Sequence, residues 1–72
     1  MNIQRQLGKR IRYLRKAKKM SIESLALEAE VNRNYLGDLE RGLRNPTLKI
    51  LAKIAMALEV SLDELFKGLQ IL

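Results

Sequence analysis

The chain has 72 residues and a formal net charge of +6, which predicts one small basic domain spanning residues 1–72. It contains no cysteine and no histidine, which excludes disulfides and thiolate metal sites and removes the commonest metal ligand and general base, so we expect no enzyme, metal or cofactor. The excess of lysine and arginine favours a polyanionic partner, although a basic surface can also serve solubility alone.

Three segments in the first part of the chain have the period of an amphipathic helix. The first runs from about residue 3 to residue 18. The second follows Ser21, whose hydroxyl can accept a backbone N–H group of the first helical turn. The third follows Asn32, another good N-cap, and ends before Gly42, where a left-handed C-cap residue belongs.

Two further helices are expected in the second part of the chain. The fourth is capped by Thr47 or by Asn45. The fifth begins at Ser61 and runs to about Gly68. No segment shows convincing strand alternation, so the sequence predicts a compact all-α domain of five short helices.

The third predicted helix carries Asn32, Arg33, Asn34 and Asp38 on its polar face. A rigid helix that presents amide, guanidinium and carboxylate groups to one side, in a basic protein, suits the major groove of DNA. These four residues are therefore the candidates for contacts with bases.

Short motifs typical of one DNA-binding family occur in order along most of the chain. They are LGKRIR at 7–12, Ser21 with LA at 25–26, YL at 35–36, LERG at 39–42, RNP at 44–46, IA at 54–55 and LDELF at 62–66. This ordered set resembles the phage Cro and repressor type of helix-turn-helix regulator, the lambda-repressor-like DNA-binding domain. Within that group it most resembles the controller proteins of restriction–modification systems.

The resemblance implies that the second and third helices form the helix-turn-helix, with a recognition helix at about 32–40 in the major groove. It also implies a homodimer that binds a near-palindromic operator in double-stranded DNA and regulates transcription, with RNA polymerase as a further candidate partner. A phage-type repressor, an antitoxin-type autoregulator and a protein-interaction module that does not read DNA are alternatives with the same fold.

Each candidate base contact has a chemical partner and an alternative. Arg33 can bond to guanine O6 and N7, and Asn34 can bond in the same bidentate way to adenine. Asp38 can accept from cytosine N4 or can exclude wrong sites by repelling phosphate. The alternatives are that Asn32 is only an N-cap and that Arg33 and Asn34 are solvated.

Six residues are candidates for contacts with DNA phosphates. They are Ser21 and Ile22, through backbone N–H groups at the start of the second helix, and the side chains of Tyr35, Arg41, Arg44 and Asn45. Tyr35 can instead belong to the core. Arg44 is the best candidate, because it lies in the loop that follows the recognition helix.

Arg15 and Glu40 match family positions that form a buried ion pair between the first and third helices. The alternative is two unrelated surface charges. The chain departs from the family at Ile22, where glutamine is usual, and at Lys19 and Glu30, where glycine is usual. If Lys19 and Glu30 are left-handed, each strains the chain by ~1 kcal/mol.

The apolar C-terminal segment, residues 66–72, exceeds what a small five-helix core needs. Its apolar residues, the candidates for a dimer interface, are Phe66, Leu69, Ile71 and Leu72. The alternative is that this segment folds back on its own domain. The sequence has no apolar run of ~18 residues and no signal peptide, so we expect a cytoplasmic protein without a membrane partner.

Overall fold

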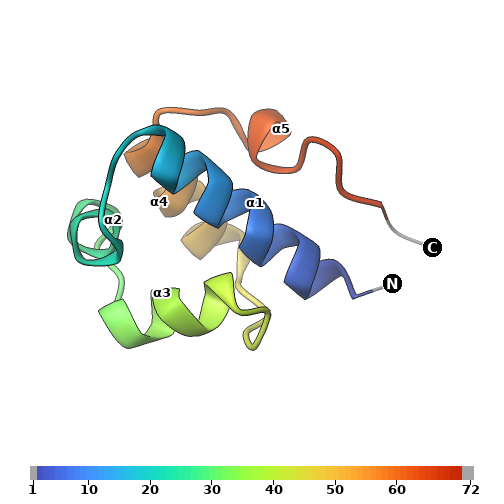
Figure 1. Ribbon diagram of the computed structural model, residues 1–72, viewed down its shortest axis with the longest axis horizontal. Coiled ribbons are helices and arrows are strands. Elements are labelled where there is room, and N and C mark those ends of the chain that lie inside the picture. The colour runs from blue at the N-terminus through green and yellow to red at the C-terminus, as the bar shows by residue number, and fades with distance from the viewer. Residues whose placement is uncertain (1, 71–72) are drawn as a thin grey trace.

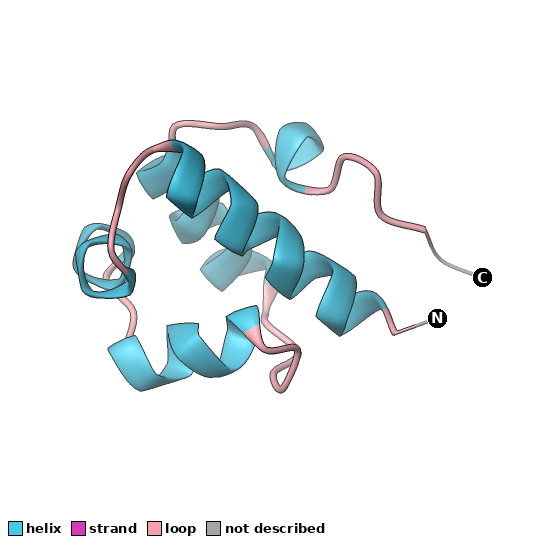
Figure 2. Ribbon diagram, in the orientation of Figure 1, coloured by secondary structure: helices cyan, strands magenta, loops and turns pink. Residues whose placement is uncertain are grey.

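Five helices joined by short loops make up residues 2–70, the part of the chain that the computed structural model describes (Figure 1). The helices are α1 (Ile3–Ala17), α2 (Ile22–Ala29), α3 (Arg33–Glu40), α4 (Leu48–Leu58) and α5 (Leu62–Leu65). No strand occurs within these residues (Figure 2). The predicted all-α fold is therefore confirmed.

Each helix begins after a residue whose side chain accepts a backbone N–H group of the first turn. These N-cap residues are Asn2, Ser21, Asn32, Thr47 and Ser61. Of the two candidates for α4, Thr47 is the cap, and its hydroxyl accepts the N–H of Ile50 at 3.2 Å. The helix starts thus follow from local chemistry, because each cap satisfies a donor that has no partner within the helix.

The predicted end of the fifth helix at about Gly68 is wrong, because α5 ends at Leu65. Beyond it the chain turns more tightly, and the N–H of Leu69 bonds the carbonyl of Phe66 at 3.1 Å. Gly68 has a φ of +83°, in the left-handed region, which an α-helix cannot include. The C-terminal segment therefore leaves the helical path just after the last core residue.

The core lies where α1 packs against α3 and α5, and where α2 packs against α3 and α4. Figure 1 shows α1 passing in front of α4, with α3 on one side of α1 and α5 on the other. The largest fully buried side chains come from all five helices and are Ile11, Leu25, Leu36, Leu39, Ile54, Leu58 and Leu65. A single hydrophobic cluster therefore holds α2 and α3 in place.

At Gly8 the backbone of α1 lies very close to that of α3. A Cβ atom built at this position would lie 2.5 Å from the carbonyl oxygens of both Leu39 and Glu40 in α3. Those neighbours are backbone atoms that cannot move aside, so only glycine allows α1 and α3 to cross at this distance. Gly42, the predicted C-cap residue after α3, has a φ of +80°.

Three non-glycine residues between residues 2 and 70 have left-handed backbones. Lys19, Glu30 and Glu59 have φ values of 58°, 58° and 59°, and the first two are the positions at which we expected strain. Glu30 and Glu59 are the C-caps of α2 and α4. The left-handed conformation allows the next N–H, that of Val31, to bond the carbonyl of Ala26 at 3.0 Å.

Replacing Glu30 by glycine is expected to raise the free energy of unfolding by about 1 kcal/mol, because glycine adopts the left-handed region without a Cβ clash. Urea and thermal denaturation followed by circular dichroism measure the change. Glu28→Gly is the matched control, because it removes the same charge from an exposed position inside α2. It should lower the stability by about 1 kcal/mol. Equal losses from both substitutions would show that the left-handed backbone at Glu30 carries no strain.

Candidate nucleic-acid interface

The helix-turn-helix segment consists of α2, α3 and the short turn between them. α3 buries Leu36 and Leu39 completely, so its opposite face is turned outward. At its N-terminal end Asn32, Arg33 and Asn34 are exposed. The structure thus brings three of the four predicted base-contact residues together at one end of one helix.

Asn32 caps α3, as the alternative interpretation proposed. Its Oδ1 atom accepts the backbone N–H groups of Asn34 at 2.8 Å and of Tyr35 at 3.2 Å. This arrangement uses the side-chain oxygen and leaves the amide NH₂ group as a donor. A base contact by Asn32 stays a prediction, and it would be made from the nitrogen.

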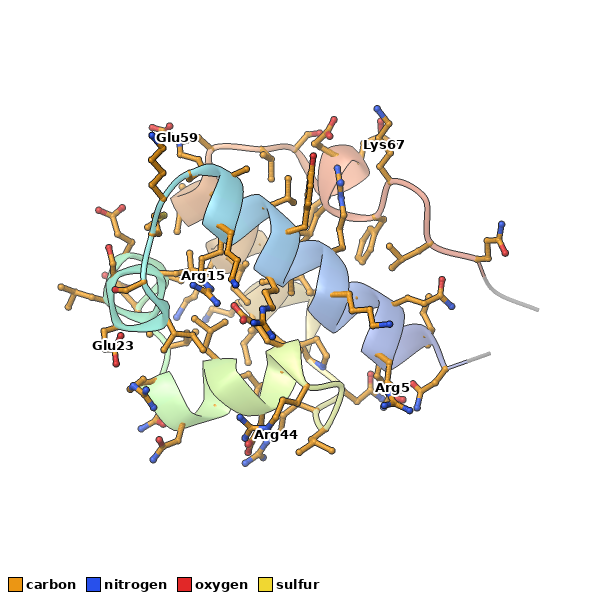
Figure 3. The ribbon with its side chains drawn as sticks, viewed as in Figure 1. Arg5, Arg15, Glu23, Arg44, Glu59 and Lys67 are labelled. Atoms are coloured by element: carbon orange, nitrogen blue, oxygen red, sulfur yellow. The ribbon has the colours of Figure 1, made fainter. Side chains whose placement is uncertain are left out.

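Arg33 is held by a carboxylate from the neighbouring helix. Its Nε atom donates to Glu23 Oε2 at 2.7 Å, and Figure 3 shows Glu23 at the same end of the molecule as the start of α3. The hydrogen bond from Arg33, together with a bond from the backbone N–H of Glu23 itself, lowers the pKa of that carboxyl group. Because only Nε is used, both Nη groups of Arg33 remain to donate to a base. The sequence analysis did not identify this partner.

Asp38 lies one turn further along α3 and holds two arginines. Its Oδ1 atom accepts from Arg41 Nη2, and its Oδ2 atom accepts from Arg44 Nη2 at 3.3 Å. The guanidinium of Arg44 also lies over the ring of Tyr35, 5.1 Å from the ring centre, which is within the range of a cation–π contact. We call Tyr35, Asp38, Arg41 and Arg44 the Asp38 cluster. It joins three of the predicted phosphate contacts to one of the predicted base contacts.

The other predicted phosphate contacts lie at the start of α2 and in the loop after α3. The hydroxyl of Ser21 accepts the N–H of Ser24 at 3.0 Å, while the side chain of Ile22 packs against the core. The donors at this end of α2 are therefore the backbone N–H groups of the first turn and the O–H of Ser21, whereas Ile22 offers no side-chain donor. Asn45 is exposed in the loop that leads to α4.

Arg15 and Glu40 form an ion pair that fixes α3 against α1 (Figure 3). Arg15 donates from Nε to Glu40 Oε2 at 2.7 Å and from Nη2 to Oε1 at 3.0 Å. Its Nη1 atom donates to the carbonyl oxygen of Met20 at 2.9 Å, in the loop that precedes α2. The hydrogen bond to Glu40 is the main cause of the raised pKa of Arg15. Both side chains are nearly buried, with exposed fractions of 11% and 5%.

A second arginine, Arg10, fastens α5 to α1. Its guanidinium donates to the carbonyl oxygen of Glu64 at 3.0 and 3.1 Å and to the carboxylate of the same residue at 2.7 Å. The Glu64 side chain therefore serves this contact, while the hydroxyl of Ser61 caps the N–H of Glu64. Nothing in the sequence indicated this pair, because its members lie far apart along the chain.

The C-terminal segment returns to α1 over the residues that the structure describes. The side-chain amide of Gln6 donates to the carbonyl of Gln70 and accepts the N–H of Gln70, both at 2.9 Å. Leu69 is partly buried against the core, as the fold-back alternative proposed, whereas Phe66 keeps 39% of its surface exposed. The remaining candidates for a dimer interface, Ile71 and Leu72, lie outside the described residues.

Within residues 2–70 no group of three or more acidic, histidine or cysteine side chains could hold a metal ion. None of the described helices combines the length and the apolar character that crossing a membrane requires.

A family model described as helix-turn-helix matches residues 11–65, which is most of the chain. This chain belongs to the helix-turn-helix family. The match includes the whole of α2 and α3, so it covers the segment that forms the candidate interface.

Named relatives of this helix-turn-helix protein are transcriptional regulators and control proteins. It is 46% identical over 61 residues to the transcriptional regulator SlrR of Bacillus subtilis, covering 83% of this chain and 40% of SlrR. It is 42% identical over 65 residues to the control protein C.BamHI of Bacillus amyloliquefaciens, covering 89% of this chain and 80% of C.BamHI. The chain thus spans less than half of SlrR and most of C.BamHI.

Solved structures share the fold. The restriction–modification controller protein C.AhdI of Aeromonas hydrophila superposes with a TM-score of 0.85 at 44% identity, over 86% of this chain and 94% of that one. SinR, in a complex with DNA, superposes with a TM-score of 0.80 at 39% identity, over 85% of this chain and 98% of that one. The predicted resemblance to helix-turn-helix regulators, including restriction–modification control proteins, is confirmed.

Replacing Arg15 by methionine is expected to lower the stability by ~3 kcal/mol, because it leaves the buried carboxylate of Glu40 without its partner. DNA affinity should fall with it, since α3 loses its attachment to α1. Denaturation and fluorescence anisotropy measure the two effects. The double variant Arg15→Met/Glu40→Leu should recover most of the stability, because no buried charge remains. A single variant as stable as the parent would mean that the ion pair does not hold the helices together.

Proposed function

We propose that this chain is a sequence-specific, double-stranded DNA-binding transcriptional regulator that acts in the cytoplasm as a homodimer on a near-palindromic operator. The observation that carries the proposal is the outward face of α3, which exposes Arg33 and Asn34 at its N-terminal end and holds the two arginines of the Asp38 cluster near its C-terminal end. The DNA-bound structure of the similar SinR supports this docking mode.

In this proposal the N-terminal end of α3 reads the bases. Arg33 bonds to guanine through its free Nη groups while Glu23 holds Nε, and Asn34 bonds to adenine N6 and N7. Asn32 and Asp38 contribute through the amide nitrogen and the carboxylate. Base specificity thus depends mainly on two adjacent side chains.

The phosphates on either side of the major groove are bound by other groups. Backbone N–H groups near Ser21 and Ile22 bind one strand, because the start of a helix attracts anions. Arg41, Arg44 and Asn45, with Tyr35 beneath Arg44, bind phosphates near the end of α3. These contacts fix the protein on the duplex without reading its sequence.

A control role in a restriction–modification system is the finer function that we propose. It is supported by C.BamHI, of which the chain covers 80%, and by C.AhdI, of which it covers 94%. An activating role would add RNA polymerase as a partner. A neighbouring endonuclease and methyltransferase gene would identify this role, whereas a toxin gene or a prophage would favour an antitoxin-type regulator or a phage-type repressor.

Selection of bound sequences from random duplex DNA tests the function, with Arg33→Ala and Arg44→Ala as a matched pair. Arg33→Ala should cost ~1–3 kcal/mol on the selected operator and relax the preference at one base pair in each half-site. Arg44→Ala should weaken all sequences alike and reduce the slope of log affinity against log salt by about 1. If the parent protein enriches no sequence, or if both variants change specificity equally, the assigned roles are wrong.

The homodimer is tested by sedimentation of the parent protein and of Phe66→Glu at tens of micromolar, on the order of a weak dimer constant. Replacing the exposed ring of Phe66 by a carboxylate should give a folded monomer. In an isologous interface the same patch of both subunits meets, so the substitution places two like charges in it. Met56→Glu is the control, since Met56 on α4 is also exposed but lies outside the C-terminal segment. A monomeric parent would contradict the homodimer. Two dimeric variants would show that Phe66 is not part of the interface.

A further inference from the structure

An open groove runs between α1 and the end of α3. It has a volume of about 420 Å³ and is lined by Arg5, Lys9, Arg12, Glu40, Arg41 and Leu43. Its only acidic lining residue, Glu40, is already bound to Arg15. The four cations therefore face the groove without a free carboxylate in its wall.

The ion pairs of the molecule leave this groove charged. Of the seven arginines in the sequence, Arg10, Arg15, Arg33, Arg41 and Arg44 each pair with a carboxylate. Arg5 and Arg12 have no ion pair within residues 2–70, and neither does Lys9 between them. Arg5 and Arg12, the two arginines without an ion pair within residues 2–70, thus both line the groove.

The three cations of α1 share one helix face, at positions i, i+4 and i+7. Like charges at this spacing repel one another and destabilise a helix slightly. They are exposed, so they add no burial to the core. Such a row costs the isolated domain free energy and becomes favourable when a polyanion lies along it.

The groove is continuous with the candidate interface through Arg41. This residue lines the groove and also belongs to the Asp38 cluster. From residue 5 to residue 12 the helix rises about 10 Å, which matches the axial rise of about three phosphates on one DNA strand. A phosphate strand that passes the end of α3 can therefore continue along α1.

We propose that the groove formed by Arg5, Lys9, Arg12 and Arg41 binds the phosphate backbone of DNA beside the stretch that α3 reads. The groove adds affinity and no base specificity, because it offers only exposed cations. This inference rests on the proposed function, since it assigns to the same DNA a second set of contacts.

The double variant Lys9→Gln/Arg12→Gln tests the groove in the full chain, on the selected operator and on an unrelated duplex. Each phosphate contact contributes about 0.9 to the slope of log affinity against log salt. The variant should therefore lose about 2 from this slope and bind both duplexes roughly 10- to 100-fold more weakly at 0.1 M salt. The ratio of the two affinities should not change. In ethylation interference, some phosphates should no longer affect the binding of the double variant, although their ethylation still weakens the binding of Arg44→Ala.

The control variant Lys18→Gln/Lys53→Gln removes the same charge from the residue that follows α1 and from α4. Lys18 pairs with Glu59, which Figure 3 shows on the side of the molecule away from α3. Circular dichroism and sedimentation check that all variants keep the fold and the oligomeric state of the parent. An unchanged salt slope, or equal losses in the groove variant and the control, would overturn the groove proposal. A parent that binds both duplexes equally would overturn sequence-specific regulation instead, and the slope would still decide whether the groove binds phosphates.

Discussion

The crossing of α1 over α3 is the contact on which the rest of the molecule depends. At Gly8 the two backbones approach so closely that no side chain fits between them. This approach places Arg15 next to Glu40, where the ion pair is almost completely removed from water. Backbone contact and a buried ion pair together keep the outer face of α3 in one orientation, as the proposed base readout requires.

The sequence predicted those parts of the fold and site that local chemistry determines. The caps Ser21 and Asn32 and the turn at Gly42 follow from the preferences of single residues and their neighbours. The outward face of α3 follows from the helical period. These features need no knowledge of the rest of the chain.

Apart from the Arg15–Glu40 ion pair, which the family resemblance implied, contacts between distant segments were not predicted, because their partners are defined only by the fold. The side chain of Arg10 gives no local sign that it will bind Glu64, and Gln6 gives none that it will bind the backbone of Gln70. The early end of α5 has the same origin, since a left-handed Gly68 and the return to α1 override the helical pattern. Gly8 was noted only as part of a motif, and its packing role became visible when α3 was placed against it.

Under the proposed function, the Asp38 cluster has a consequence for how the protein distinguishes among DNA sequences. Arg41 and Arg44 already have an anion within the protein, so any phosphate that binds them must share or displace the carboxylate of Asp38. Competition from Asp38 reduces the gain in binding free energy on arbitrary DNA, where only phosphate contacts form. A correctly matched site gains base contacts at the other end of α3 and can outweigh the competition. On this proposal the protein leaves the many wrong sites quickly, at some cost in maximum affinity.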